Sequence, residues 1–173
     1  MNIRSIKNSI RWKIVLIYCI LVFIATTIVG VFLMSRMEEY YINSARTNMR
    51  KLVEESSLTA SVGAYDPFDE FAEEIQASID AWSPGFSQEI FVVDETFYIV
   101  AASNASSGQS AVDFLDCNII LSALSGEEAE SHDSISSQTS DIPVFNMAFP
   151  IKNESGKVIG ALYLREDITS LED

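Results

Sequence analysis

Histidine, cysteine and glycine are scarce in these 173 residues, and each shortage argues against a class of chemistry. The chain has one histidine, two cysteines and seven glycines. A Ser–His or Cys–His catalytic set would have to use His132, and no G-x-S-x-G or cysteine signature accompanies it. The glycines form no phosphate-binding loop, and the acids do not have EF-hand spacing. The sequence therefore predicts no catalytic site and no bound cofactor.

The two cysteines are not expected to form a disulfide within one chain. Cys19 lies inside a long apolar segment and Cys117 lies far outside it, so the two thiols would sit at different depths. An exported domain without disulfides is more typical of a bacterial surface than of a eukaryotic secretory route. We interpret Cys117 as a small buried apolar residue rather than a reactive thiol.

Residues 14–34 (IVLIYCILVFIATTIVGVFLM) contain no charge, and 14 of these 21 residues are Ile, Leu, Val or Phe. As a helix the segment would be about 31 Å long, which matches the hydrocarbon core of a bilayer at about 30 Å. A signal peptide would have a shorter apolar region and a small-residue cleavage site, whereas SRMEE follows here. The segment therefore predicts an uncleaved transmembrane helix.

Acidic residues are absent before position 35, whereas four basic residues, Arg4, Lys7, Arg11 and Lys13, precede the apolar segment. An excess of Lys and Arg marks the cytoplasmic side of a span. We therefore expect residues 1–13 in the cytoplasm and residues 35–173 outside a bacterial cell membrane. The outer part has 25 acids against seven bases, a net charge of −18, which argues against nucleic acid and anionic lipid as partners.

Residues 35–62 are predicted to continue the membrane helix as a stalk, because no helix breaker interrupts them. Its apolar residues recur at intervals of three and four, namely Ile42, Ala45, Met49 and Leu52. This spacing is typical of a short coiled-coil seam, so the stalk could pair with its twin in a homodimer. Two heptads are too few to decide, and the same face could equally lie against its own domain.

Residues 63–173 are predicted to form one α+β domain. Asp66 and Pro67 resemble the start of a helix that ends at Ser83-Pro84-Gly85. Its buried face would consist of Phe68, Phe71, Ile75 and Ile79. Two hairpins of β-branched and aromatic residues follow, at 90–100 and at 144–164, separated by a helix at 112–124 and a polar, acidic loop at 127–140. Antiparallel strands covered by helices then make up the domain.

Five short segments resemble the extracytoplasmic half of transmembrane sensor histidine kinases, especially the cell-wall-regulating type of Gram-positive bacteria. They are SIRWKIVLIY at 9–18, FVVD at 91–94, ALSG at 123–126, FPI at 149–151 and GKVIGALYL at 156–164. The resemblance implies a PAS-like (Cache-type) sensor, with a long N-terminal helix and a central antiparallel sheet that can hold a ligand. It also implies a second membrane helix, a HAMP linker and a kinase core.

The sequence departs from that family in two respects. It ends at Asp173, where the second membrane helix should begin, and it lacks the phosphate-accepting histidine motif and the ATP-binding motifs. We therefore expect a fragment without catalytic activity, whose full-length protein would be a protein histidine kinase. The cytoplasmic kinase core would be a partner absent from this chain.

Two groups of residues are candidate sites. The first is acidic, with one imidazole, and could hold Ca²⁺, Mg²⁺ or Zn²⁺, or could form a solvated loop; it consists of Glu127, Glu128, Glu130, His132 and Asp133. The second belongs to the ligand pocket that the resemblance implies, and it consists of Tyr98, Asn146 and Tyr163. By simple strand alternation, Asn146 could instead point to solvent.

The leading interpretation is a sensor that passes a cell-surface signal inward through the stalk and the membrane helix. The sensor half of a chemoreceptor or a cyclase would look the same in this part of the sequence. A single-pass, membrane-tethered interaction protein is the alternative from a different class.

Overall fold

The computed structural model describes residues 10–68, 70–104, 106–136 and 141–167. The chain divides into two compact units, Met1–Tyr41 and Ile42–Asp173. One helix, α2 (Ile10–Ser56), contributes its first part to the first unit and its last part to the second. The predicted division between stalk and domain, at residues 62 and 63, thus differs from the boundary of the compact unit, which lies at 41 and 42.

The first unit is dominated by the apolar part of α2. Every side chain from 14 to 34 is exposed to the surroundings. Among the described residues, α2 is the one helix that is long and apolar enough to cross a membrane. An apolar surface of this kind is stable in lipid and unfavourable in water, so the exposure fits the predicted span.

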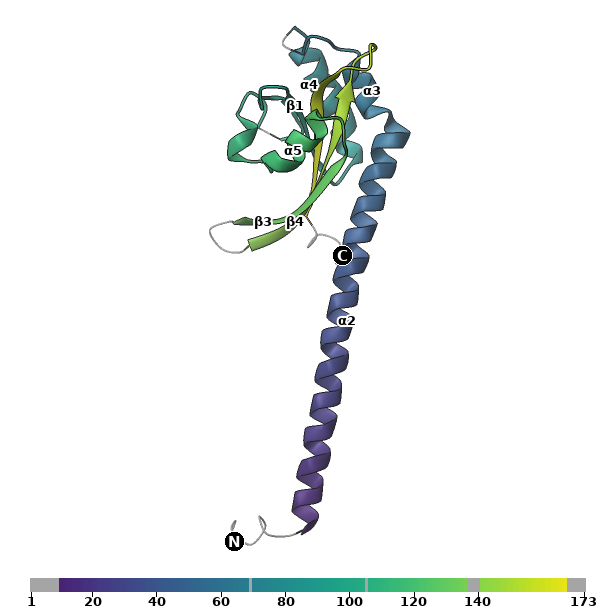
Figure 1. The fold of residues 1–173 in the computed structure, drawn as a ribbon, viewed down its shortest axis with the longest axis vertical. Coiled ribbons are helices and arrows are strands. Elements are labelled where there is room, and N and C mark those ends of the chain that lie inside the picture. Colours follow the sequence, from purple (N-terminus) through teal and green to yellow (C-terminus); the bar gives the residue numbers. More distant parts are fainter. Residues whose placement is uncertain (1–9, 69, 105, 137–140, 168–173) are drawn as a thin grey trace. The chain divides into compact units, whose positions relative to one another are not determined.

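The second unit is built around a five-stranded antiparallel sheet with the strand order β2-β1-β5-β4-β3 (Figure 1). Its strands are β1 (Glu89–Asp94), β2 (Ile99–Ala102), β3 (Ala129–Ser136), β4 (Asp141–Lys152) and β5 (Val158–Asp167). The two predicted hairpins are confirmed as β1–β2 and β4–β5. In the second of them, the turn is held by the side-chain oxygen of Asn153, which accepts from the backbone N–H groups of Ser155 and Lys157.

Helices cover both faces of the sheet (Figure 1). One face packs against α2, α3 (Leu58–Gly63) and α4 (Ala72–Trp82), and we call this core the α2 layer. The other face packs against α5 (Cys117–Leu124) and the short 3-10 helix η2 (Ala111–Asp113), and we call this core the α5 layer. Because strand residues alternate between the faces, neighbouring strand residues such as Leu162 and Tyr163 belong to different layers. The predicted α+β architecture is confirmed.

The helix predicted to start at Asp66 begins later, at Ala72. The Oδ2 atom of Asp66 accepts a hydrogen bond from Nδ2 of Asn153 at 2.8 Å, so this carboxylate ties a loop to the β4–β5 turn instead of capping a helix. The apolar face is nevertheless as expected, since Ile75 and Ile79 are fully buried in the α2 layer. The helix predicted at 112–124 is also shorter and starts at Cys117.

The outer edge of β2 is covered by the segment that follows it. The backbone N–H of Ile99 donates to the carbonyl of Gln109 at 2.9 Å, and the N–H of Gly108 donates to the carbonyl of Ile99 at 2.8 Å. This segment therefore occupies hydrogen-bonding groups that an edge strand would otherwise expose. The opposite edge of the sheet is β3.

The acidic segment predicted as a loop is largely a strand. Residues 129–136 form β3, which pairs with β4 in continuous antiparallel register from Ala129–Ala148 to Ser136–Asp141. No strand pattern is visible in this part of the sequence, because the segment is polar and rich in serine. Its pairing comes from β4, whose alternating apolar residues are buried on both faces. Residues 137–140 lie outside the described residues.

Candidate functional site

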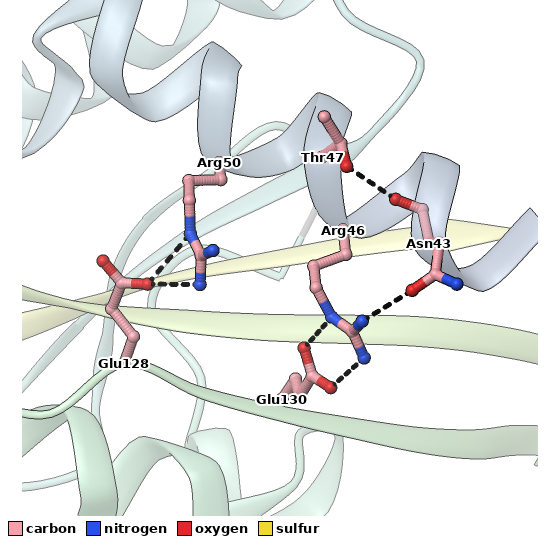
Figure 2. Close-up of polar contacts among 6 residues, drawn as sticks. All are labelled: Asn43, Arg46, Thr47, Arg50, Glu128 and Glu130. Atoms are coloured by element: carbon pink, nitrogen blue, oxygen red, sulfur yellow. Dashed lines mark hydrogen bonds and ion pairs between the residues drawn. The ribbon is translucent and has the colours of Figure 1, made fainter.

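Two arginines on α2 reach across to two glutamates on and beside β3, and we call this set of four the α2–β3 clamp (Figure 2). Arg46 donates to both carboxylate oxygens of Glu130, with an Nε–Oε2 distance of 2.6 Å. Arg50 donates from Nε and Nη2 to one oxygen of Glu128, at 3.2 and 2.9 Å. A two-pronged contact of the Arg46 kind fixes orientation as well as distance.

The spacing of these residues explains why they meet. Arg46 and Arg50 are four positions apart and so lie on one face of α2, while Glu128 and Glu130 are two positions apart and point to one side of the extended chain. Between these two arginines, Met49 belongs to the α2 layer and is fully buried. Apolar packing thus sets the rotation of the helix, and the clamp follows from that rotation.

The Arg46–Glu130 pair changes the acid–base behaviour of both groups. The hydrogen bond from Arg46 lowers the pKa of Glu130, partly opposed by its burial. The same hydrogen bond raises the pKa of Arg46. Arg46 is further oriented by Asn43, whose Oδ1 accepts from Nη1 at 2.8 Å. The pair is therefore held ionised and in one geometry at neutral pH.

Most of the residues predicted to bind a metal have other partners in the described part of the chain. Among the described residues, no group of three or more His, Cys, Asp or Glu side chains is placed to hold a metal ion. Glu128 and Glu130 are engaged by the clamp, and the ring of His132 stacks on Phe145 with centroids 5.1 Å apart. Glu127 is exposed, and the side chain of Asp133 lies outside what the structure describes. A carboxylate neutralised by arginine is a poor cation ligand, so the clamp would compete with a metal ion for Glu128 and Glu130, and the metal site stays a prediction.

The three residues proposed to line a ligand pocket have separate environments. Tyr98 is 46% exposed and its backbone forms a bridge with Ser110. Tyr163 is fully buried in the α5 layer, where its hydroxyl accepts a hydrogen bond from the backbone N–H of Asp116 at 3.3 Å. Burial raises the pKa of this phenol. Asn146 is buried rather than turned to solvent, and its partners are Ser131 and Arg165.

The sequence interpretation missed Arg165, which connects this face of the sheet. Its guanidinium lies 5.5 Å from the ring centroid of Phe91 and 5.9 Å from that of Tyr163, so it is in cation–π contact with both. Its Nη2 donates to the carbonyl of Phe114 at 2.5 Å, and its Nη1 is 3.6 Å from a Glu89 oxygen. The side chain is 14% exposed. The role of Arg165 follows from its position opposite Glu89 on the neighbouring strand. That position is known only once the register of β1 and β5 is known.

Arg165 fixes the covering segment to the sheet. Its bond to Phe114 and the bond from Asp116 to Tyr163 both hold the chain between η2 and α5 over the α5 layer. Beneath that segment, aromatic and aliphatic side chains fill the space, including Phe91, Ile119 and Ile120. This face is therefore a packed core, and the guanidinium of Arg165 holds its covering segment in place.

The predicted dimer seam is part of the domain's own core. Ala45 is 1% exposed and Met49 is fully buried, both in the α2 layer, and Ile42 and Leu52 pack against the same layer. The structure thus takes the second alternative for this helical face, packing on its own sheet. Ile42 and Leu52 are only partly buried, and both the dimer seam and homodimerisation stay predictions.

Three comparisons with known proteins bear on the domain. The family model of the Cache domain of the WalK sensor protein kinase matches residues 74–165. The sensor histidine kinase WalK of Bacillus subtilis is 24% identical over 178 residues, covering 100% of this chain and 28% of that protein. The sensor protein kinase WalK of Staphylococcus haemolyticus is 23% identical over 168 residues, covering 95% of this chain and 27% of that protein. The chain thus spans about a quarter of the length of these relatives.

Solved structures with the same fold include two ligand-binding domains of chemoreceptors. The domain of Campylobacter jejuni Tlp3, solved with 4-methylisoleucine, has a TM-score of 0.57 at 11% identity and covers 76% of this chain and 55% of that one. The domain of Pseudomonas aeruginosa PctC, solved with GABA, has a TM-score of 0.54 at 14% identity and covers 74% and 55%. At such identities the likeness concerns the fold.

Proposed function

The chain belongs to the family of WalK sensor kinase Cache domains, and from this premise we propose that it anchors and controls a membrane-bound protein histidine kinase. Its sheet domain is the Cache sensor, and α2 is its candidate membrane span. The kinase core, the extracytoplasmic orientation of the domain and a homodimeric assembly are parts of the proposal.

The observation that carries the proposal is that one helix serves both units. Within the sheet domain, α2 is held by buried residues such as Met49 and by the clamp to β3. The same helix contains the apolar segment 14–34. A stimulus that changes the packing of the sheet must therefore act on a helix that also enters the membrane, and it can bias two arrangements of that helix only by its different affinity for them.

Helix-phase insertions in the full-length protein would test this coupling. Two alanines inserted after Met37 would rotate the helix by about 200°, whereas seven would return it to nearly the same phase, because an α-helix has about 3.6 residues per turn. We expect the two-residue insertion to change autophosphorylation strongly and the seven-residue insertion to leave it close to wild type. A two-residue insertion in the Asn153–Lys157 turn is the matched control. Equal activity in all variants would contradict transmission through α2 and favour a membrane tether.

Cysteine labelling of intact cells would test the orientation. Both native cysteines, Cys19 and Cys117, are replaced by serine, and a single cysteine is placed at exposed Ser155 in the β4–β5 turn. An impermeant maleimide should label Ser155→Cys without lysis. Ser5→Cys, on the predicted cytoplasmic side, should be labelled only after lysis. The reverse pattern would overturn the proposed topology.

A further inference from the structure

A buried carboxyl group lies on the α2 side of the sheet, near the end of β5. Glu166 is 3% exposed and pairs across the strands with Phe145 of β4. Strand alternation puts it on the same face as Leu162 and Leu164, which belong to the α2 layer. An ionised carboxylate at such a depth is unfavourable unless it is paired and fully hydrogen-bonded.

Glu166 has too few hydrogen-bond partners to stabilise an ionised carboxylate in this buried position. Gln88, which precedes β1, forms a side-chain hydrogen bond with the carboxyl. The Oε2 atom is buried and has no hydrogen-bond partner among the described residues. Burial raises the pKa of Glu166, and the bond from Gln88 opposes that rise only in part. Because an amide can either donate or accept, Gln88 can serve both the ionised and the protonated carboxyl.

The charged side chains of α4 are exposed to solvent, and those on the other surrounding elements are turned away or engaged elsewhere. On β1, Glu89 faces the other layer and pairs with Arg165. On α2, Arg46 is committed to Glu130, and on β3, His132 stacks on Phe145, the cross-strand neighbour of Glu166. Asp167, next to Glu166, points to the opposite face by alternation. The segment 83–88 ahead of β1 contains no charged residue.

We propose that Glu166 is a proton-controlled latch that fastens the end of β5 to the α2 layer. The protonated carboxyl fits the apolar packing, whereas the carboxylate is buried without a compensating cation among the described residues and loosens that packing. A carboxyl group whose pKa is higher in the folded state makes folding more favourable at low pH, and this contribution is lost as pH rises from the unfolded value of 4.5 through the folded pKa. Acidification therefore tightens this end of the sheet and a rise in pH loosens it. The latch is a property of the domain and does not depend on the proposed kinase.

Thermal unfolding of the full chain in detergent, between pH 4 and 8.5, tests the latch. Glu166→Gln is an uncharged mimic of the protonated acid, so we expect its melting temperature at pH 8 to exceed that of wild type by about 3 °C or more. The difference should shrink toward pH 4, where wild-type Glu166 is protonated. The matched control is Glu89→Gln, which removes a carboxylate from the same sheet that is paired with Arg165. It should give no stabilisation at pH 8.

Hydrogen exchange of individual amides reports local opening near Glu166, which thermal unfolding of the whole chain does not resolve. In wild type, amides at the end of β5 should exchange several-fold faster at pH 8 than in Glu166→Gln, after correction for intrinsic rates, while amides of α5 behave alike in both. Equal pH profiles for wild type and Glu166→Gln, or a less stable Glu166→Gln at pH 8, would overturn the proposal. If Glu166→Gln does not fold, Glu166→Met provides the same uncharged comparison, and failure of both variants to fold would also overturn it.

Discussion

Arg46 on α2 and Glu130 on β3 are 84 positions apart in the sequence, and their side chains meet in a two-pronged ion pair with an Nε–Oε2 distance of 2.6 Å. Edge strands are the least secured elements of a sheet, since they pair on one side only. Here the edge strand is fastened to the helix that also carries the apolar segment 14–34, the candidate membrane span. Movement of β3 is therefore resisted by α2, and movement of α2 is resisted by β3.

Charge reversal of this pair should be destabilising and reciprocal. Arg46→Glu or Glu130→Arg places like charges together, and each should lower the stability of the domain by about 0.5–1 kcal/mol at low salt, as expected for partly exposed pairs. The double variant should recover most of the loss, which a double-mutant cycle of thermal unfolding would measure. Lys51→Glu is the control, because among the described residues Lys51 pairs with Glu55 of the same helix and not with β3. Additive effects of the two reversals would contradict the pair.

The contribution of Glu130 should also depend on pH, with a sign opposite to that of Glu166. Its pKa is lowered in the folded domain by the Arg46 hydrogen bond. A lowered pKa stabilises the folded state above the unfolded value of 4.5, and that stabilisation is lost as pH falls through the folded pKa. The destabilisation caused by Glu130→Gln should accordingly be full at pH 7 and vanish in strong acid. Unfolding curves recorded from pH 2 to 7 check this, and a constant difference would contradict it.

Truncation of Met49 should destabilise the sheet domain itself. Met49→Ala removes a fully buried side chain from the α2 layer, which typically costs about 2–5 kcal/mol. Exposed Asn48 provides the control, and Asn48→Ala should stay within about 0.5 kcal/mol. Chemical denaturation, with the oligomeric state measured in parallel, separates the two roles of this face. If Met49→Ala dissociated a dimer and left the domain equally stable, the face would be a seam after all.

Two glycines should not accept a side chain. A Cβ atom at Gly63 would lie 2.1 Å from the carbonyl oxygen of Lys152, and one at Gly160 would lie 2.6 Å from that of Val93. Because both obstacles are backbone, Gly63→Ala and Gly160→Ala should each lower stability by about 1–3 kcal/mol in thermal unfolding. Gly85→Ala is the control, since nothing lies within 4 Å of its Cβ position. A neutral result at both sites would show that the strands and α3 can separate freely.

The N-terminus of α5 depends on one carboxylate. Asp116 accepts a hydrogen bond from the backbone N–H of Asn118 at 2.9 Å. Asp116→Ala should cost about 1 kcal/mol, whereas Asp116→Asn, which keeps a capping oxygen, should cost only a few tenths. Thermal unfolding distinguishes the two variants. Equal losses in both would indicate that the charge matters rather than the cap.

The sequence predicted those elements whose apolar pattern matches their packing. The strand containing Leu162 and Leu164 alternates, and α4 repeats its apolar residues with helical spacing, so both were identified. β3 was missed because its stability comes from pairing with β4 and from the clamp, neither of which leaves an apolar pattern. The alternation of β5 also puts Glu166 on a buried face. A charged side chain is normally expected at the surface, so the pattern alone did not predict its burial.

The candidate site was harder to predict than the fold. Grouping Glu128, Glu130 and His132 by nearness in sequence suggested a metal site, but their partners come from α2 and β4. Arg165 gains its role only through register, which sets it opposite Glu89 and Asn146. Such relationships depend on long-range pairing, which local pattern does not encode.

The covering of β2 by the segment around Gln109 limits how these domains could aggregate. A sheet polymerises end on end only if it can recruit strands at both margins. Here the β2 margin is covered at Ile99 by the chain's own backbone, whereas the opposite margin is β3. Strand addition between molecules is therefore expected at β3 rather than at β2.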